Sequence, residues 1–255
     1  MAGVVGVGQF FSWDAGCMFI GRHASRIPAH AHHAIQIVFG VGGSVRLRPD
    51  DEGPWTEYAA AVVPSGQPHA LDATGTACAA ILLVEPETRE GRTLAELYPR
   101  GGIVSSDDGS LSEAGPALLS AWLDGRDRLA VVGAVRQVLR AITRGVEPAV
   151  ISDARILRAV SYVAAHLDGP IALREVAADA CLSPSRFRHL FVEQTGMALR
   201  PYILWRRLLL VWERVMAGES LAAAAHSAGF ADSAHLARTS RRMLGVAPSS
   251  LQFTR

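Results

Sequence analysis

Residues 173–191 read LREVAADACLSPSRFRHLF, the pattern of two short helices joined by a tight turn. The first helix carries an apolar stripe at helical spacing, formed by Leu173, Val176, Ala177 and Ala180. Ser183 is a strong N-cap for the second helix, and Pro184 fits its first position, where no N–H is needed. Phe187, Leu190 and Phe191 are expected to face inward. The outward side chains, placed to meet base edges in a major groove, are Ser185, Arg186, Arg188 and His189.

The same pattern recurs at residues 221–242, LAAAAHSAGFADSAHLARTSRR. Ser220 can cap the first helix, Gly229 suits a left-handed turn, and Phe230 can fill the core behind that turn. The outward side chains of this unit are Ser233, His235, Arg238, Arg241 and Arg242.

The second half of the chain, residues 151–255, is predicted to be helical throughout. Ser152 is a candidate N-cap for its first helix. The predicted helices are residues 153–167, 173–180, 184–194, 200–216, 221–227 and 232–244.

Charge and groove chemistry indicate an anionic partner for this half. Residues 151–255 hold 13 Arg against eight Asp and Glu, a net charge of +5, whereas residues 1–150 have −4. Arginine can donate two hydrogen bonds to guanine and histidine can donate one, so Arg186, His189 and Arg238 are predicted to read bases. The other outward arginines, predicted to hold phosphates, are Arg188, Arg241 and Arg242.

The 255-residue composition fits a globular protein of one or two domains. Hydrophobic residues make up 49% of the chain, yet no apolar run reaches the roughly 18 residues of a membrane helix. The three cysteines are far apart and form no CxxC pair. We therefore expect a cytoplasmic protein without a membrane partner.

The first half predicts β-structure followed by a helix. Short strands separated by Pro and Gly are expected near residues 35–39, 44–48, 58–63 and 77–84, which suggests a small barrel or sandwich. Further on, apolar residues fall on one face of a predicted helix: Leu129, Val132, Val135, Val138, Leu139 and Ile142. This helix either packs on the barrel or forms a dimer interface.

Histidines gather in two motifs of the first half. His30 to Gly43 read H-x-H-x3-Q-x6-G, and Pro64 to His69 read P-x-G-x2-H. Residues two apart share one face of a strand, so His30 and the next histidine of the motif, His32, point the same way. Imidazole-rich sites suit Zn, Cu, Ni or Fe.

The two helical units resemble the DNA-binding domain of AraC/XylS-type transcription regulators over residues 153–253. The resemblance is carried by Leu182–Ser185, Leu190-Phe191, Thr195-Gly196, Arg207-Leu208 and Gly245–Pro248. It implies base contacts from the helix positions named above. Ala224, Leu236 and Ser240 stand where the family usually has bulkier residues, which predicts an underpacked second unit.

The histidine motifs resemble those of the cupin barrel. In metal-binding cupins two His, a Glu and a later His hold one ion, but this chain has the neutral Gln36 in place of the Glu. Regulators of the AraC/XylS type often use the barrel as an effector pocket without a metal. We therefore expect a small-molecule effector, with a divalent transition metal as the alternative cofactor, at His30, His32, Gln36 and His69.

The expected architecture is α+β. A cupin-like β-barrel spans residues 1–85, a helical connector and possible dimerisation segment spans 86–150, and an all-α domain with two helix-turn-helix units spans 151–255. The expected function is ligand-responsive, sequence-specific transcription regulation, not enzyme catalysis. Its expected partners are double-stranded promoter DNA, the effector, RNA polymerase and a second copy of the chain.

Two alternatives remain open at this point. One is a metal-dependent cupin enzyme fused to a helical domain, against which the missing Glu and the basic helical half both count. The other is a DNA-binding protein whose barrel serves as a dimerisation scaffold.

Overall fold

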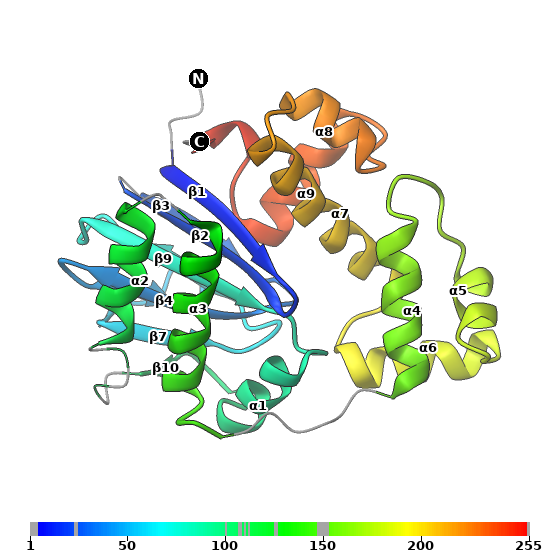
Figure 1. The fold of residues 1–255 in the computed structure, drawn as a ribbon, viewed down its shortest axis with the longest axis horizontal. Helices are drawn as coiled ribbons and strands as arrows, with labels where there is room; N and C mark the ends of the chain where they lie inside the picture. Colours follow the sequence, from blue (N-terminus) through cyan, green and yellow to red (C-terminus); the bar gives the residue numbers. More distant parts are fainter. Residues whose placement is uncertain are drawn as a thin grey trace.

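The computed structural model describes residues 5–22, 25–99, 101–106, 109, 111, 113–124, 127–146 and 153–253. It has the expected α+β architecture, with a strand-rich first half packed against a helical second half (Figure 1). None of the described helices is long and apolar enough to cross a membrane.

Two sheets form the first half. The larger has the order β10-β7-β4-β9-β2-β1-β11 and the smaller β3-β8-β5-β6. Their bounds are β1 Gly6–Trp13, β2 Gly16–Arg22, β3 Arg26–His30, β4 Ile35–Val41, β5 Val45–Arg48, β6 Thr56–Tyr58, β7 Ala60–Val63, β8 His69–Asp72, β9 Cys78–Val84, β10 Val104–Ser105 and β11 Leu251–Phe253. The predicted strands correspond to β4, β5, β6 with β7, and β9, whereas the other strands were not predicted.

The large sheet is buried on both faces, which explains its continuous apolar runs. Side chains alternate along a strand, so Ile37 and Leu82 pack under the helices α2 (Ala114–Leu123) and α3 (Arg128–Ile142). The next residues along these two strands point to the opposite face of the sheet. Val38 packs against the small sheet, and Leu83 packs against the helices of the second half.

Helix α3 lies on the large sheet beside α2 (Figure 1). It packs along much of the predicted apolar face, with Val135, Val138 and Ile142 fully buried. The register differs at the start of the helix. Leu129 is 77% exposed and Val131 takes the inward position instead. The prediction is therefore wrong for the first turn of α3, where Val131 and not Leu129 packs on the sheet.

The second half consists of α4 Ala154–Ala165, α5 Leu173–Asp179, α6 Pro184–Thr195, α7 Leu199–Met216, α8 Leu221–Ser227 and α9 Ser233–Leu244. Each predicted helix is present with bounds within two residues of those expected. Ser152, the candidate cap of α4, lies outside the described residues, and the side chain of Asp153 caps this helix by accepting from Arg155 N.

The end of the chain returns to the first half. Strand β11 pairs in parallel with β1, joining Gly6 to Leu251 and Gly8 to Phe253. Trp212, Phe230 and other residues of the helical half share one apolar core with Phe10 and Leu83 of the large sheet. The two halves are therefore packed as one body.

A buried carboxylate ties the small sheet together. Asp72 of β8 is fully buried, and its carboxylate accepts from Arg26 Nε at 2.8 Å, from Arg46 Nη2 at 2.6 Å and from the Thr74 hydroxyl at 2.6 Å. Burial by itself raises the pKa of Asp72, but the hydrogen bonds from Thr74 and Arg26 outweigh it and lower the pKa to about 2.

Because folding lowers this pKa, Asp72 stabilises the protein when ionised, and that contribution is lost as the pH falls from about 4 towards 2. We expect Asp72→Asn to reduce the free energy of unfolding at neutral pH by about 2 kcal/mol and to weaken its dependence on pH in this range. Urea titrations between pH 2 and 7 measure both effects. The exposed Asp14→Asn is the control, and an equal acid response of the two variants would contradict the assignment.

Candidate nucleic-acid interface and histidine site

Helices α5 and α6 form the first helix-turn-helix unit. Ser183 caps α6, its hydroxyl accepting from Arg186 N at 3.3 Å, and Pro184 occupies the first turn. Phe187, Leu190 and Phe191 are buried in the core of the unit, as predicted. The predicted outward residues are all exposed: Ser185, Arg186, Arg188 and His189.

Helices α8 and α9 form the second unit. Ser220 caps α8, Asp232 caps α9, and Gly229 adopts the left-handed conformation with φ +77° between them. The exposed predicted residues are Ser233, Arg238, Arg241 and Arg242. His235 is half-buried, because its ring packs edge-on against Phe230 at 5.2 Å between centroids.

Ser240 is a polar residue in the core of the second unit, at a position where the AraC/XylS-type family usually has a bulkier residue, and it has a hydrogen-bond partner nearby. Ser240 is fully buried, and its hydroxyl donates to the Val246 carbonyl at 2.7 Å. Ala224 and Leu236 are buried in the core that the second unit shares with the large sheet. The sheet therefore supplies part of the apolar packing around this unit.

One arginine of α7 links the two units. Arg207 donates from Nε to the Leu167 carbonyl at 2.9 Å, from Nη1 to the Gly229 carbonyl at 2.8 Å and from Nη2 to the Gly169 carbonyl. Leu167 and Gly169 belong to the loop before the first unit, and Gly229 forms the turn of the second. The guanidinium thus fixes the orientation of the two units relative to each other.

The exposed arginines of α6 and α9 are available to a ligand. Within the part of the chain that the structure describes, no carboxylate forms an ion pair with Arg186, Arg188, Arg238, Arg241 or Arg242. Exposed cations without a protein partner can neutralise phosphates or donate to base edges.

The histidine site lies where β3, β4 and β8 meet. It brings together all four predicted residues, His30, His32, Gln36 and His69, each of them buried. The ring centroids of His30 and His69 are 4.3 Å apart, and that of His32 lies 5.2 Å from that of His69. Gln36 Oε1 lies 3.1 Å from His32 Nε2.

These imidazoles are held in the neutral form. Burial lowers the pKa of His30 and of His69 below the usual value, and it lowers the pKa of His32 to about 4. Neutral imidazole is the form that binds a metal ion or accepts a hydrogen bond. Two buried nitrogens, His69 Nε2 and Gln36 Nε2, have no hydrogen-bond partner among the described residues.

A second polar cluster lies behind His33, whose side chain points away from this site. His33 Nε2 lies 2.9 Å from Glu87 Oε2 and 3.4 Å from Glu85 Oε2. Tyr202 and Trp205 of α7 donate to Glu87 and Glu85 at 2.7 and 2.8 Å. Burial opposes the charge on His33, but Glu87 outweighs it and raises the pKa of His33 above the usual value.

This cluster was not predictable from the sequence, because His33 lies more than 50 residues from Glu85 and Glu87 along the chain. The nearest signal was the pair of acidic residues that directly follows strand β9, Glu85 and Glu87. The cluster joins the barrel to α7 through buried hydrogen bonds.

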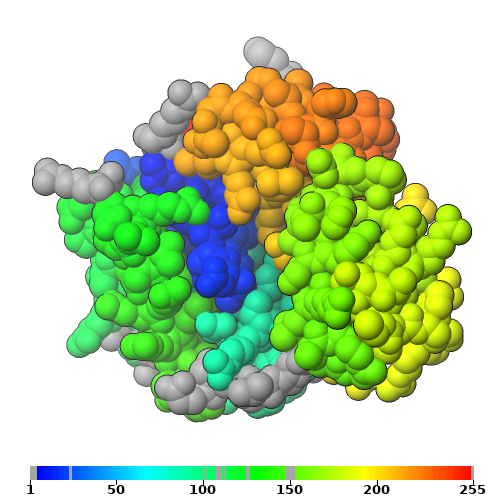
Figure 2. All heavy atoms as spheres, turned by 45° about the vertical axis from the view of Figure 1, so that its right-hand side comes forward, coloured from blue at the N-terminus to red at the C-terminus, as the bar shows by residue number. Residues whose placement is uncertain are grey.

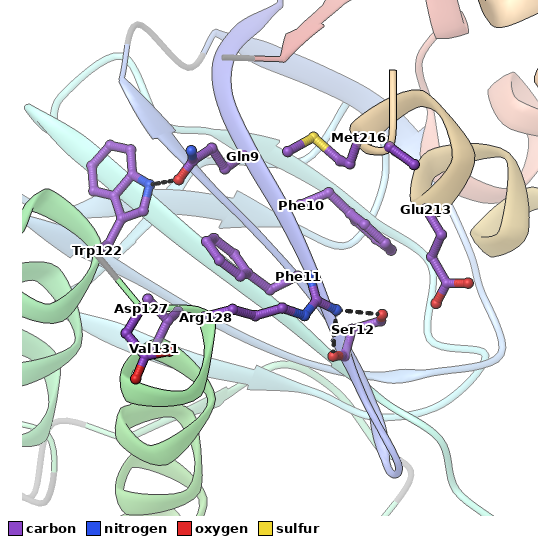
Figure 3. Close-up of a pocket in the computed structure, with 11 residues that line it drawn as sticks. Gln9, Phe10, Phe11, Ser12, Trp122, Asp127, Arg128, Val131, Glu213 and Met216 are labelled. Carbon is purple, nitrogen blue, oxygen red and sulfur yellow. Dashed lines mark hydrogen bonds between the residues drawn. The ribbon is translucent and has the colours of Figure 1, made fainter. Parts of the chain in front are cut away.

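A cleft of about 600 Å³ separates β1 from the helices beside it. Figure 2 shows β1 at the floor of a hollow between α3 and the C-terminal part of α7. Phe10, Phe11 and Met216 give it an apolar wall, and Arg128 donates to the carbonyl and hydroxyl of Ser12 (Figure 3). The cleft is distinct from the histidine site.

Comparison with known proteins places the helical half in a family. Residues 176–252 match the family model described as a helix-turn-helix domain. The arabinose operon regulatory protein of Salmonella typhimurium is 31% identical over 109 residues, covering 39% of this chain and 36% of that protein. The Escherichia coli protein of the same name is 30% identical over 123 residues, covering 45% and 39%. The chain therefore spans less than two fifths of these curated relatives.

Solved structures resemble the whole chain. Apo ToxT from Vibrio cholerae, in a variant form, has a TM-score of 0.58 at 12% identity and covers 94% of both chains. A ToxT structure with a bound unsaturated fatty acid has a TM-score of 0.55 at 12% identity, covering 94% and 92%. At this identity, the likeness shows a shared fold.

The chain thus carries two helix-turn-helix units that one long helix joins, packed on a domain of two sheets. The C-terminal half of the chain matches the helix-turn-helix family model and is similar to the arabinose operon regulatory proteins, which agrees with its resemblance to the DNA-binding domain of AraC/XylS-type regulators.

Proposed function

We propose that the protein is a ligand-responsive transcription regulator that binds a specific site in duplex DNA. The observation that carries the proposal is the pair of capped helices, α6 and α9, whose exposed arginines have no described carboxylate partner and whose units Arg207 holds together. A catalytic role is not needed to explain these features, so we infer a regulator and not an enzyme. RNA polymerase and a second copy of the chain are the further partners we propose, in the cytoplasm where promoter DNA is found.

Helices α6 and α9 are proposed to enter successive segments of the major groove. Recognition helices contact base edges with their N-terminal residues, and Arg186 and Arg238 lie in the first and second turns of their helices. Their guanidinium groups can each donate two hydrogen bonds to guanine. His189 is proposed to read a base beside Arg186. Arg188, Arg241 and Arg242 are proposed to hold phosphates, and the surface is completed by Ser185, Ser233 and His235.

The effector is proposed to bind at His30, His32, Gln36 and His69. The burial of these residues and their two unpartnered nitrogens support a ligand site inside the barrel. The fold is compatible with such a role, because a ToxT structure of the same fold carries an unsaturated fatty acid.

Specific DNA binding is tested with the full chain and a duplex selected from a randomised pool. Fluorescence anisotropy at about 150 mM salt is expected to give an affinity for the selected duplex about 10³-fold higher than for a scrambled one. Both affinities should fall steeply with salt, because phosphate contacts release counterions. Equal affinity for the two duplexes would contradict the proposal.

Loss of either base-reading arginine is expected to weaken binding at a different place. Arg186→Ala and Arg238→Ala should each cost about 1–3 kcal/mol and relax the base preference at one part of the site. Single-base substitutions across the selected duplex locate each effect. Arg136→Ala, an exposed arginine of α3, is the control and should bind like the wild type. A uniform loss for all sequences would make these residues phosphate contacts.

A further inference from the structure

The second polar cluster, between the barrel and α7, has the donor set of a metal site. We propose that His33, Glu85 and Glu87 together bind one divalent transition-metal ion. The side chain of His33 points away from the histidine site described above, and the two groups of residues share no ligand. Binding of an ion at this second place does not depend on the proposed function.

The three side chains converge on one point. One ligand atom of each lies within 4.8 Å of those of the other two, and all three residues are buried. His33 Nε2 lies 2.9 Å from Glu87 Oε2 and 3.4 Å from Glu85 Oε2. Ligand atoms that one ion holds at about 2.0–2.2 Å lie about 3–3.5 Å from their neighbours. The three side chains therefore need little movement to share one ion.

Each carboxylate turns one oxygen to α7 and the other to His33. Glu87 Oε1 accepts from the Tyr202 hydroxyl at 2.7 Å, and Glu85 Oε1 accepts from Trp205 Nε1 at 2.8 Å. Donors of this kind orient carboxylates around bound metal ions, where they hold the oxygen that the ion does not use. Both Oε2 atoms are thereby left to face the imidazole.

A single imidazole N–H does not serve two carboxylates. The contact of His33 Nε2 at 2.9 Å is with Glu87, whereas Glu85 Oε2 is buried and accepts no hydrogen bond from the described residues. Burial first, and then the charge on Glu87, raises the pKa of Glu85 above its usual value, because a second buried negative charge here is costly. A divalent ion would contact both Oε2 atoms at once and offset this cost.

The surroundings leave room for an ion and its water. Glu85 lines a cavity of about 260 Å³ between β1 and β2 on one side and α4 and α7 on the other. Water in this cavity can complete the coordination of an ion that three protein ligands hold. Arg206, the nearby cation on α7, donates to the Tyr202 hydroxyl at 3.2 Å, on the side of the cluster away from the Oε2 atoms.

The donor set also selects the class of ion. One imidazole nitrogen with two carboxylate oxygens suits Mn²⁺, Fe²⁺ or Zn²⁺, whereas soft ions such as Cu⁺ prefer sulfur ligands. The ion would take the place of the proton that His33 Nε2 donates to Glu87. Because Tyr202 and Trp205 hold both carboxylates, the ion would also strengthen the contact between α7 and the barrel.

Metal binding is measured on the full chain, stripped with a chelator and titrated with Mn²⁺, whose free fraction is followed by electron paramagnetic resonance. We expect about one ion per chain. Glu85→Gln keeps the size of the side chain and an acceptor for Trp205, and it should bind Mn²⁺ at least about 100-fold more weakly, as should His33→Gln. The control is His166→Ala, which removes an exposed imidazole. Thermal unfolding of each metal-free variant checks that it is folded.

Two further measurements tell this site from the histidine site. His69→Ala should retain Mn²⁺ binding, and electron spin echo modulation of the bound Mn²⁺ should show coupling to one imidazole nitrogen. Loss of binding in His69→Ala with full binding in Glu85→Gln would place the ion at the histidine site and overturn the proposal. Less than one-tenth of an ion per chain, or equal Mn²⁺ affinity in Glu85→Gln and the wild type, would overturn it as well.

Discussion

Replacing Arg207 by alanine is expected to lower the free energy of unfolding by about 3–5 kcal/mol and to abolish specific DNA binding. Its guanidinium donates to the carbonyls of Leu167 and Gly169, in the loop before the first helix-turn-helix unit, and of Gly229, in the turn of the second. Charged hydrogen bonds each contribute about 1.5–3 kcal/mol, and the variant leaves three partly buried carbonyls without a donor. The two units would also lose the link that sets their spacing.

Urea unfolding and anisotropy on the selected duplex measure these effects. Arg207→Lys should recover a part of the stability, because an ammonium lacks the planar fork that reaches three carbonyls at once. Arg200→Ala, an exposed position on the same helix, is the matched control and should change the free energy of unfolding by less than about 0.5 kcal/mol. If Arg207→Ala were as stable as this control, the linking role would be wrong.

Glu87→Ala is expected to destabilise the folded chain by about 3–5 kcal/mol, since it removes the centre of a buried charge cluster. The carboxylate lies 2.9 Å from His33 Nε2 and accepts from the Tyr202 hydroxyl at 2.7 Å. Its removal leaves a buried imidazole that Glu87 had favoured in the charged form, and a buried hydroxyl without its acceptor. Because Tyr202 lies on α7, contact between the barrel and the helical half should weaken as well.

The comparison that isolates the charge is Glu87→Gln, which keeps the size of the side chain and an acceptor for Tyr202. We expect its loss of stability to fall between those of Glu87→Ala and the wild type in chemical unfolding. Glu96→Ala, exposed on α1 (Arg89–Leu97), is the control and should behave like the wild type. Unchanged stability in Glu87→Ala would show that the cluster does not hold the two halves together.

The helices of the second half were predictable because their signals are local. Ser183 and Ser220 cap their helices within three residues, and Gly229 takes its left-handed turn at the position that the sequence indicates. Apolar spacing then decides which side of α6 faces inward. None of these inferences needs a contact between distant parts of the chain.

The contacts between the two halves were not predictable in this way. Glu85 meets Trp205, and Glu87 meets Tyr202, across more than 100 residues of sequence. Strand β11 pairs with β1 from the opposite end of the chain, and nothing in its three residues indicates that partner. The error in the predicted inward face of α3 has a similar origin, because the exposure of Leu129 depends on where this helix meets the sheet.

The histidine site was predictable from the sequence only in part. The spacing of His30 and His32 predicts a shared strand face, and His69 joined them through the resemblance to cupin motifs. The strand prediction is wrong for His32, because β3 ends at His30 and His32 lies between β3 and β4. The structure brings the rings together and adds the carbonyl contacts of Pro28, Ala34 and Gln67, which depend on backbone geometry. Those contacts are absent from the motif.

We propose that α6 and α9 read one DNA site together, and hydroxyl-radical footprinting of the full chain on its selected duplex is the test of this joint reading. Two recognition helices in one chain should protect two segments about one helical turn, roughly 34 Å, apart on the same face of the duplex. Arg186→Ala should lose protection at one segment and Arg238→Ala at the other. A single protected segment, or two variants that weaken the same one, would contradict the account.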